Sequence, residues 1–525
     1  MASINLDTFR DKVLGCWAGK NIGGTLGGPF ETKPGPLNIS FYTHKLDGQP
    51  LPNDDLDLQL IWLGAMEKHF SPYHLTPRIM GQLWYDHIIG PWNEYAVCVK
   101  NISRGFYPPL SGVVDNEHWK WSNGAWIRSE IWACCFPGSP DEAIQLAWLD
   151  ACCDHCGEGI FAEMFTAALE SAAFVEDDIQ TLIDIALARI PADSRIARAV
   201  GIALQYYREG KTWLEAREAL LKDSEDIGTL QAPCNVAFAV VGLLWGEGDL
   251  GKTVCTAVNC GDDTDCTAAT AGSVIGIIKG FSRLPEKWLK PIGMGIRSIS
   301  FSPFGDIYPE LPNTLQELTD RVFNIAWQTS VYNPRLPRIR KGPAGFTDEE
   351  RGKLRVSEFG GGWNKSEGTV AERLWKRSST EMVYQLDWIK MYVQYPDDPE
   401  FVPGQPFRIS LHFYRGTRDV DDIRLTWKLP QGWSCGEQTQ YLFITRYRTN
   451  ERVHFDLIPP ADALPLDYAD LVIGRRGHTC EDIIRLPLQR KGASHASLEK
   501  EEAHIYDYCL LNSRRTARDL DQELE

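Results

Sequence analysis

The hydrophobic pattern of this 525-residue chain changes near residue 380, and this change most constrains the fold. Before about residue 330, apolar residues recur every three or four positions, which indicates amphipathic helices. After residue 380, β-branched and aromatic residues form short runs that turn residues separate, a pattern typical of antiparallel strands. The sequence therefore predicts a multidomain protein, with an all-α domain followed by a small antiparallel β-sandwich.

These patterns divide the chain into four expected parts. The helical domain covers residues 1–330, and a stretch rich in Pro, Gly and charge at 331–375 is expected to be a linker. The sandwich covers 376–495, and the charged segment 496–525 is expected to form a helical tail. Within the first part, helices are expected at 58–69, 141–152, 160–174, 178–190, 195–208, 212–221 and 236–245.

The charge balance of the chain excludes some partners. A net charge of -17 opposes binding to nucleic acid or to an anionic membrane. An anionic substrate would need local positive charge, which a bound divalent metal can supply. The first twenty residues lack the apolar core of a signal peptide, and no apolar stretch is long enough to span a bilayer.

Cysteine usage points to the cytoplasm. The chain has 14 cysteines, several of them inside apolar helical patterns, as at Cys134-Cys135 and Cys152-Cys153. Such neighbours are awkward for disulfide pairing and suit buried, reduced thiols. A zinc site at Cys152, Cys153, His155 and Cys156 is an alternative, although the spacing lacks paired CxxC units.

Two groups of aspartates, more than two hundred residues apart, each precede a helical pattern. The first contains Asp54, Asp55 and Asp57, and the second Asp262, Asp263 and Asp265. A single Asp before a helix is an ordinary N-cap, but three exceed that need, and close like charges repel unless a cation relieves them. The two groups together favour a shared site for Mg²⁺, Mn²⁺ or Ca²⁺, which prefer oxygen ligands.

The order of these motifs resembles the ADP-ribosylglycohydrolase family over most of residues 8–330. The resemblance rests on Gly15, Gly19 and Gly23 on one helical face, Glu31, Asp54-Asp55, and Asp263-Thr264-Asp265 followed by Ala268-Ala269 and Gly272. It implies a helical bundle holding one or two magnesium ions, with Mn²⁺ as an alternative. It also implies roles for individual residues: Asn53, Asp54, Asp55, Asp263, Asp265 and Cys266 as metal ligands, and Glu31 and Asp55 as catalytic residues.

Three positions depart from the family pattern. Asn53 stands where Thr is usual, Cys266 where Thr or Ser is usual, and Gly24 where many members have Asp. An amide can offer oxygen to a hard ion, but a thiol is a poor magnesium ligand. One of the two metals is therefore expected to bind weakly, bind differently or be absent.

Two further segments are expected to face the substrate. Residues 122–128 resemble the segment lining the ribose side of the pocket, and residues 154–159 resemble one whose His or Asp approaches the substrate. The expected substrate-binding residues are Asn123, Gly124, Trp126, Arg128, Asp154 and His155. Each of these residues has an alternative role. His155 could be structural, Arg128 could be in a buried ion pair, and Trp126, with the tryptophans near it, could belong to the core.

The expected function is hydrolysis of a glycosidic bond at the anomeric carbon of an ADP-ribosyl or related furanosyl group, on a small molecule or a protein. Metals would fix two vicinal hydroxyls while a water attacks through an oxocarbenium-like transition state. A turn at 429–433 resembles accessory β domains of bacterial carbohydrate enzymes, which favours a free glycoside or nucleoside-like substrate as an alternative. Asn53 and Cys266 favour a second alternative, a non-catalytic relative that binds a nucleotide sugar.

Overall fold

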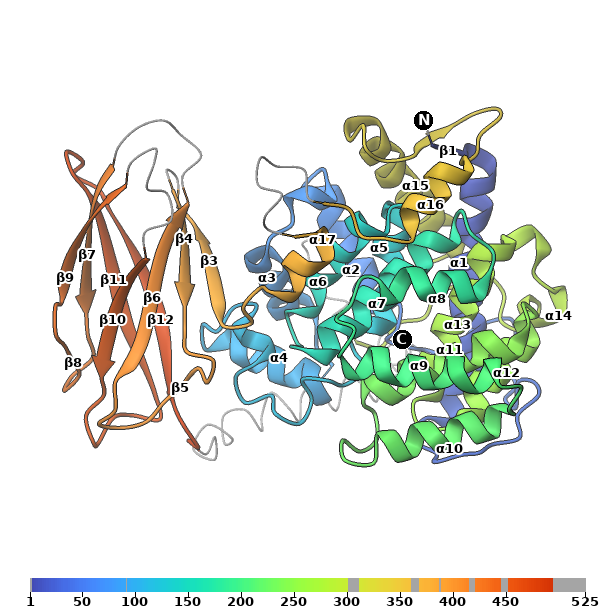
Figure 1. The fold of residues 1–525 in the computed structure, drawn as a ribbon, viewed down its shortest axis with the longest axis horizontal. Coiled ribbons are helices and arrows are strands. Elements are labelled where there is room, and N and C mark those ends of the chain that lie inside the picture. Colours follow the sequence, from blue (N-terminus) through green and yellow to red (C-terminus); the bar gives the residue numbers. More distant parts are fainter. Residues whose placement is uncertain are drawn as a thin grey trace, which may run out of the picture.

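The computed structural model describes residues 2–90, 92–300, 311–359, 368–386, 389–414, 421–444 and 452–493. Helices gather on one side of the molecule and two β-sheets on the other (Figure 1). The helices of the first part are α1 (Leu6–Gly27), α2 (Asp57–Lys68), α3 (Pro77–His87), α4 (Asn93–Ser103), α5 (Glu130–Cys135), α6 (Pro140–Ala151), α7 (Glu158–Ala173), α8 (Ile179–Leu187), α9 (Arg195–Arg208), α10 (Trp213–Asp223), α11 (Ala232–Gly246), α12 (Leu250–Cys260), α13 (Thr264–Lys279), α14 (Glu286–Leu289) and α15 (Leu315–Tyr332).

Each helix predicted from periodicity is present, and its ends follow the local chemistry. Helix α3 begins with Pro77 after Thr76, whose hydroxyl accepts a hydrogen bond from the Ile79 amide. Helix α10 begins with a capping box between Thr212 and Glu215. These side chains satisfy amide groups that a helix leaves unpaired in its first turn. The predicted all-α domain is confirmed.

Helices α1 and α13 form an antiparallel pair of unusually close approach. A Cβ atom added to any of four glycines of α1 would overlap the backbone of α13. The overlapping pairs are Gly15 with Gly276, Gly19 with Gly272, Gly23 with Ala268, and Gly27 with Thr264. Each step of four residues along α1 is thus matched by four residues back along α13. The small residues bring the end of α1 against the beginning of α13, where the second aspartate group lies.

The segment 331–375, expected as a linker, packs on the helical part. It contains β2 (Arg338–Arg340), which pairs in parallel with β1 (Ser3–Asn5), and helices α16 (Asp348–Leu354) and α17 (Val370–Trp375). Arg189, which is buried, donates hydrogen bonds to the carbonyl oxygens of Leu354 at 2.6 Å and Val356 at 2.9 Å. These contacts join residues 338–340 and 354–356 of the segment to the helical part.

The second part of the chain is a sandwich of two five-stranded sheets. One sheet has the order β3-β4-β6-β10-β8 and the other β5-β12-β11-β7-β9; their pairs are antiparallel except β5 with β12. Apolar side chains of both sheets form one buried cluster between them. The strands are β3 (Glu381–Gln385), β4 (Lys390–Gln394), β5 (Glu400–Phe401), β6 (Phe407–Tyr414), β7 (Asp421–Lys428), β8 (Ser434–Cys435), β9 (Thr439–Ile444), β10 (Arg452–Ile458), β11 (Leu466–Arg475) and β12 (Glu481–Arg490).

The sandwich core continues into the helical part. Phe106, Leu110 and Val114, from the segment after α4, belong to the same buried cluster as the sheet residues. A Cβ atom added to Gly105, which follows α4, would lie 3.7 Å from Pro487 Cγ of the sandwich. Shared apolar burial of this kind holds two domains in a defined arrangement.

Three sequence expectations about this region have different outcomes. Trp433 of the 429–433 turn is buried: it packs on Phe401 and donates to Asp467 at 3.0 Å, so it serves the sandwich core. Strand β12 lies inside the range 376–495 predicted for the sandwich, although it begins with charged residues and contains Pro487. The expected helical tail, 496–525, lies outside the described residues.

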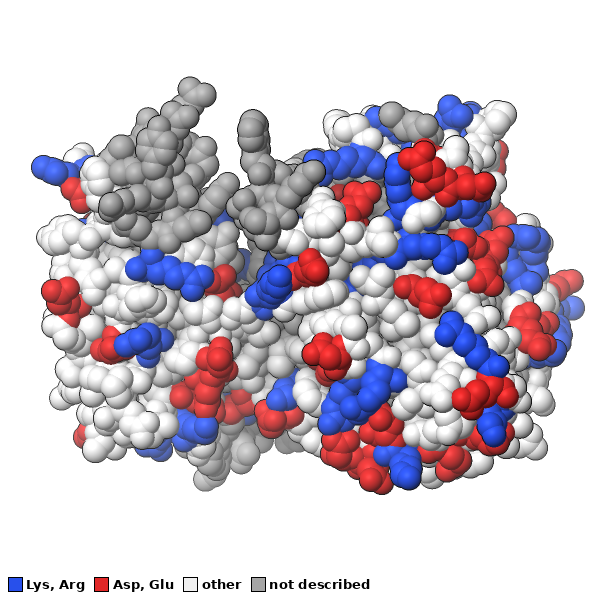
Figure 2. Space-filling model, viewed as in Figure 1, with Lys and Arg blue, Asp and Glu red and all other residues white. Residues whose placement is uncertain are grey.

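The surface in view is mixed in charge. Acidic and basic side chains are interspersed over the helical part, and much of the sandwich face is uncharged (Figure 2). Among the described residues, no helix has both the length and the apolar character needed to cross a bilayer. The cysteines of the described residues are all free.

Candidate metal centre and active site

Three loops meet at the end of α1. Glu31 lies just after the short 3₁₀ helix Gly28–Phe30 that extends α1. The next residues pair with the loop before α13: the Thr32 amide donates to the Asp262 carbonyl at 2.8 Å, and the Asp262 amide donates to the Lys33 carbonyl at 2.7 Å. Gly261 and Asp262 both have positive φ, +82° and +64°, which lets this loop turn sharply. This bridge brings Glu31 to the second aspartate group.

Four of the six predicted ligands, together with Glu31, lie in two overlapping triads, and Asn53 and Asp54 belong to neither. The ligand atoms of Glu31, Asp263 and Asp265 all lie within 4.8 Å of one another, and so do those of Asp55, Asp265 and Cys266. Asp265 is common to both triads. The structure therefore brings together residues that are more than two hundred positions apart, and either triad could hold a metal ion.

Helix capping does not account for Asp263. This residue occupies the N-cap position of α13, yet its side chain makes no cap hydrogen bond. By contrast, Asp249 at the N-cap of α12 accepts a hydrogen bond from the Lys252 amide at 2.8 Å. The N-cap residue of α2 is Leu56, so Asp54 and Asp55 do not cap that helix through their side chains. The alternative that these aspartates are ordinary caps is therefore disfavoured.

Three buried carboxylate oxygens in the cluster lack a protein partner. Within the described part of the chain, Asp55 Oδ2, Asp263 Oδ1 and Asp265 Oδ1 accept no hydrogen bond. The side chains of these aspartates are only 2–6% exposed. A buried carboxylate without a partner is costly, and a divalent cation is the group that several of them would share. The residues present therefore fit a hard metal ion.

The electrostatics agree with this geometry. Asp265, with a smaller contribution from Asp54, raises the pKa of Glu31 to about 8, and burial with Asp265 raises the pKa of Asp54 to about 7. Burial and neighbouring carboxylates also raise the pKa values of Asp55 and Asp263 well above the usual range. Mutual repulsion of this size is what a bound cation relieves.

Two members of the aspartate groups have structural roles. Asp57 Oδ2 accepts hydrogen bonds from the amides of Ile299 and Ser300, each at 2.7 Å. Asp262 accepts hydrogen bonds from the Leu230 amide at 3.1 Å and the Asn235 side chain at 3.0 Å. Both carboxylates hold loops beside the cluster, so each sequence motif combines site residues with a structural one.

The three departures from the family pattern lie together. Asn53 donates from Nδ2 to Asp265 Oδ2 at 3.1 Å, and its Oδ1 accepts the Asp55 amide at 2.7 Å. A Cβ atom on Gly24 would lie 2.9 Å from Asn53 Nδ2, so glycine leaves room for the amide. Cys266 Sγ lies 3.4 Å from Asp55 Oδ1. In this arrangement the side-chain amide nitrogen of Asn53 orients the Asp265 carboxylate.

A buried ion pair beneath the cluster was not anticipated from sequence. Lys20 Nζ lies 2.8 Å from Glu130 Oε1, and both side chains are buried. Gln59 connects this pair to the cluster, since its Nε2 donates to Glu130 Oε2 at 2.8 Å and to the Asp55 carbonyl at 2.9 Å. Lys20 is the one charged residue between Val13 and Phe30, which is a signal that could have revealed it.

Asn123, predicted to bind substrate, contacts the acidic cluster, and Trp126, predicted for the same role, contacts Asn123. Asn123 Nδ2 donates to Asp263 Oδ2 at 2.6 Å, and its Oδ1 accepts the Trp126 Nε1 hydrogen at 3.0 Å. Trp126 is fully buried, so neither ring face is available for stacking on a sugar. Gly124 leaves space for Glu94, because a Cβ atom at residue 124 would overlap the Glu94 carboxylate. Glu94 is buried, and its Oε2 has no hydrogen-bond partner within the described residues. This residue was not identified from the sequence.

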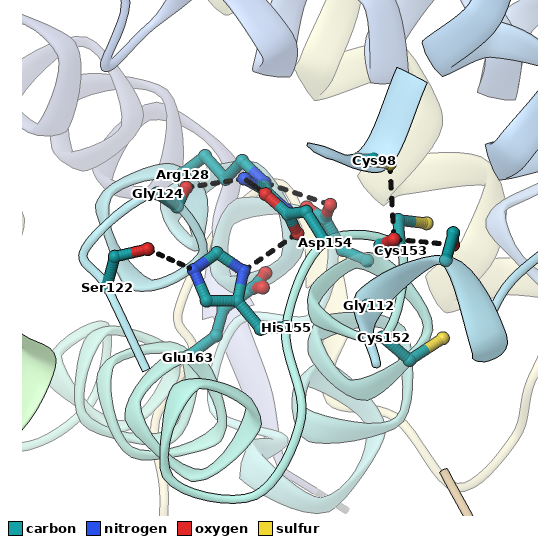
Figure 3. Close-up of polar contacts among 12 residues, drawn as sticks. Cys98, Gly112, Ser122, Gly124, Arg128, Cys152, Cys153, Asp154, His155 and Glu163 are labelled. Carbon is teal, nitrogen blue, oxygen red and sulfur yellow. Dashed lines mark hydrogen bonds and ion pairs between the residues drawn. The ribbon is translucent and has the colours of Figure 1, made fainter. Parts of the chain in front are cut away.

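Arg128, Asp154 and His155 form a second, separate polar network (Figure 3). Arg128 Nη2 donates to Asp154 Oδ1 at 2.7 Å, and its Nε donates to Asp150 Oδ1 at 2.9 Å. His155 Nδ1 lies 2.8 Å from Asp154 Oδ1, and His155 Nε2 lies 3.3 Å from Ser122 Oγ. Burial opposes the charged form of Asp154, but Arg128 and His155 lower its pKa to about 2.

The side chains of this network are enclosed in the domain. Arg128, Asp154 and His155 are at most 1% exposed. Arg128 is thus in a buried ion pair, which was the alternative to substrate contact. His155 has the surroundings of a structural residue. Cys152 and Cys153 donate their thiols to the Leu149 carbonyl, and within the described residues they do not form a metal-binding group with His155.

Residues 5–328 match the sequence model of the ADP-ribosylglycohydrolase family, so the chain belongs to that family. No curated protein gives a significant match. Family membership supports a glycohydrolase-type function, and the acidic clusters have the composition to hold a metal ion.

Proposed function

We propose that this protein is a divalent-metal-dependent hydrolase that cleaves a glycosidic bond at the anomeric carbon of an ADP-ribosyl or related furanosyl group. The observation that carries the proposal is the gathering of Glu31 and three buried aspartates in two groups that share Asp265, each aspartate having one carboxylate oxygen without a partner among the described residues. Neither capping nor an ion pair within the described residues accounts for that arrangement. Mg²⁺, or Mn²⁺ in its place, is the expected ion because most of the donors are carboxylate oxygens.

The ligand set would comprise Asn53, Asp54, Asp55, Asp263, Asp265 and Cys266 around one or two ions. A divalent ion supplies Lewis-acid polarisation of substrate oxygens and water at this position. Asn123 and Asn53 keep Asp263 and Asp265 in place through their side-chain amides. The chain's own contribution is therefore a rigid, negatively charged surface that favours the developing positive charge of an oxocarbenium-like transition state.

Glu31 is the proposed proton acceptor. Its side chain is exposed at the edge of the cluster, whereas Asp263 and Asp265 are buried. A carboxylate in that position can reach both solvent and the bound substrate and take a proton from the attacking water. Asp55 is the second candidate, since its Oδ2 also faces the cluster without a partner from the described residues.

Arg297 offers local positive charge for an anionic substrate. This exposed residue lines a small hollow together with Gly24, Asn53 and Asp55. We propose that it contacts the negatively charged part of the substrate, such as a diphosphate. Replacing Arg297 with Ala would then raise KM for a charged substrate and leave the KM of a neutral nitrophenyl furanoside nearly unchanged.

Calorimetric titration of the metal-free full chain with Mg²⁺ and Mn²⁺ tests the metal requirement. Saturable binding is expected for the wild type and for Asp249→Ala, which loses only a helix cap, and no binding is expected for Asp263→Ala. Wild-type turnover in Asp263→Ala would remove the metal assignment. Turnover should also stop in EDTA and return with Mg²⁺.

A substrate panel tests the leaving group. Protein-linked ADP-ribose, a small ADP-ribosyl compound and nitrophenyl furanosides would be compared at equal concentration. Cleavage of the ADP-ribosyl compounds supports the proposal, whereas exclusive cleavage of furanosides assigns a free glycoside as substrate. Metal-sensitive binding of ADP-ribose without any product would assign a non-catalytic relative.

A further inference from the structure

The thiol of Cys266 lies within the group of atoms that would bind metal. Its Sγ is 3.4 Å from Asp55 Oδ1, and the ligand atoms of Cys266, Asp55 and Asp265 are all within 4.8 Å of one another. Cys266 is in the first turn of α13, directly after Asp265, and is only 7% exposed. The other triad, Glu31, Asp263 and Asp265, offers oxygen atoms alone.

Independent evidence that this position takes a ligand comes from the carboxylates around the thiol. Asp55 Oδ2 and Asp265 Oδ1 are buried, and neither accepts a hydrogen bond within the described part of the chain. Lys20, which lies near Asp55, is bound to Glu130 instead. A positively charged group is therefore needed beside the sulfur itself, and not only beside Glu31.

The two triads differ in the metals they suit. Three oxygen donors favour hard ions such as Mg²⁺, which also binds with strict octahedral geometry. A set of two carboxylates and one thiolate favours ions of intermediate softness, such as Zn²⁺ and Co²⁺. Three protein ligands also leave an open coordination position, as catalytic zinc sites do.

We propose that the cluster consists of two unlike half-sites, and that Asp55, Asp265 and Cys266 bind a zinc-class ion in preference to Mg²⁺. The inference rests on the proposed function, because it takes the acidic cluster to be a metal site. On binding, the thiol releases its proton to solvent and the sulfur binds as thiolate. The site with Glu31, Asp263 and Asp265 keeps its preference for Mg²⁺, so a mixed pair of metals fills the cluster.

Co²⁺ titration of the reduced, metal-free full chain tests the sulfur ligand directly. A thiolate bound to Co²⁺ gives a charge-transfer band in the near ultraviolet, which an all-oxygen site cannot produce. The band is expected in the wild type and in Cys152→Ser, which changes a buried cysteine whose thiol donates to the Leu149 carbonyl. It is expected to be absent from Cys266→Ser.

Affinities provide the second readout. Cys266→Ser should weaken Zn²⁺ binding by roughly 100-fold or more, since changes even outside the ligand set cost about 10–100-fold. Its Mg²⁺ affinity should stay within about threefold of wild type, because the oxygen triad is intact. Cys266→Thr, which keeps an oxygen at this position, is used if the serine variant does not fold.

The outcomes separate this inference from the proposed function. Calorimetric binding of both Mg²⁺ and Co²⁺ without the charge-transfer band would overturn the mixed site and leave the metal-dependent hydrolase standing. A band that survives in Cys266→Ser would assign the sulfur to another cysteine and also overturn it. Absence of any metal binding would remove both proposals together.

Discussion

Two polar clusters are buried in the same helical domain, and they are built in opposite ways. Around Arg128, the chain supplies its own cation, and Asp150 and Asp154 bind it at 2.9 and 2.7 Å. Around Asp265, several carboxylates face one another, and some of their oxygens have no partner within the described residues. We call the first cluster complete because it contains its own cation, although Glu94 Oε2 and Glu163 Oε2 beside it have no hydrogen-bond partner within the described residues. The second cluster is incomplete in charge and stores repulsion that a ligand can relieve.

Removing the cation from the complete network should have the largest effect. Arg128→Met would leave Asp150 and Asp154 buried without their partner, and the free energy of unfolding should fall by about 3–5 kcal/mol. Urea denaturation followed by tryptophan fluorescence measures this loss. Arg408→Ala, which breaks an exposed pair with Asp456, should lower the free energy of unfolding far less, because solvent screens that pair. Equal effects of the two variants would contradict the comparison.

Loosening the support of the incomplete cluster should affect metal binding more than stability. Asn123→Ala removes the hydrogen bond to Asp263 and should weaken Mg²⁺ binding by about 10–100-fold. Trp126→Phe removes only the bond that orients Asn123 and should have a smaller effect. Calorimetry measures both. If Asn123→Ala keeps wild-type affinity, Asp263 does not depend on this support.

Neutralising one carboxylate of the incomplete cluster should stabilise the metal-free protein. Asp263→Asn removes a repelling charge, and the free energy of unfolding should rise by about 1 kcal/mol while Mg²⁺ binding is lost. Asp249→Ala loses a cap and should instead lower stability by about 1 kcal/mol, with metal binding retained. Thermal unfolding in EDTA distinguishes them, and destabilisation by Asp263→Asn would count against stored repulsion.

The smallest expected effect is a change in pH dependence. The pKa values of Glu31 and Asp54 are raised to about 8 and about 7, so the folded metal-free protein binds more protons than the unfolded chain between about pH 4 and 8. The stability contributed by these groups is therefore greatest at low pH and decreases as pH rises through that window. Glu31→Gln should show a shallower decrease than wild type in EDTA.

Saturating Mg²⁺ should abolish or reverse this difference, because the ion holds the carboxylates in their ionised form. Thermal unfolding of wild type and Glu31→Gln at several pH values, with and without Mg²⁺, measures it. If the stability of the two proteins in EDTA decreases equally with pH, the other carboxylates of the cluster do not repel Glu31.

The sequence predicted the ranges of seven of the fifteen helices described in the first part, and the site loops, because periodicity and capping are local properties. It also predicted the face shared by Gly15, Gly19 and Gly23, which does contact a second helix. It could not separate the structural aspartates from those of the site. Asp57 and Asp262 bind backbone amides of loops remote in sequence, and local patterns carry no information about such partners.

Strand β12 and the Lys20–Glu130 pair show the same limit. Pro487 lacks an amide hydrogen and argues against a strand, but it lies in a part of β12 that pairs with β11 alone, since β5 pairs only with Gln489 and Arg490. Lys20 is tolerated inside α1 because Glu130, more than a hundred residues later, neutralises it. Both depend on tertiary contacts that a single sequence does not specify.

The spacing of the glycines along α1 and α13 has a consequence for how this chemistry can vary. One α-helical turn rises about 5.4 Å, which exceeds the 4.8 Å within which each triad's ligand atoms lie. A slip of a single turn between the two helices would therefore separate Glu31 from Asp263 and Asp265 entirely. The close approach of Gly19 to Gly272 fixes the axial position of α1 relative to α13, and with it the position of the Glu31 loop relative to the Asp263 loop. Residues without any functional group therefore determine the distance between the candidate metal ligands.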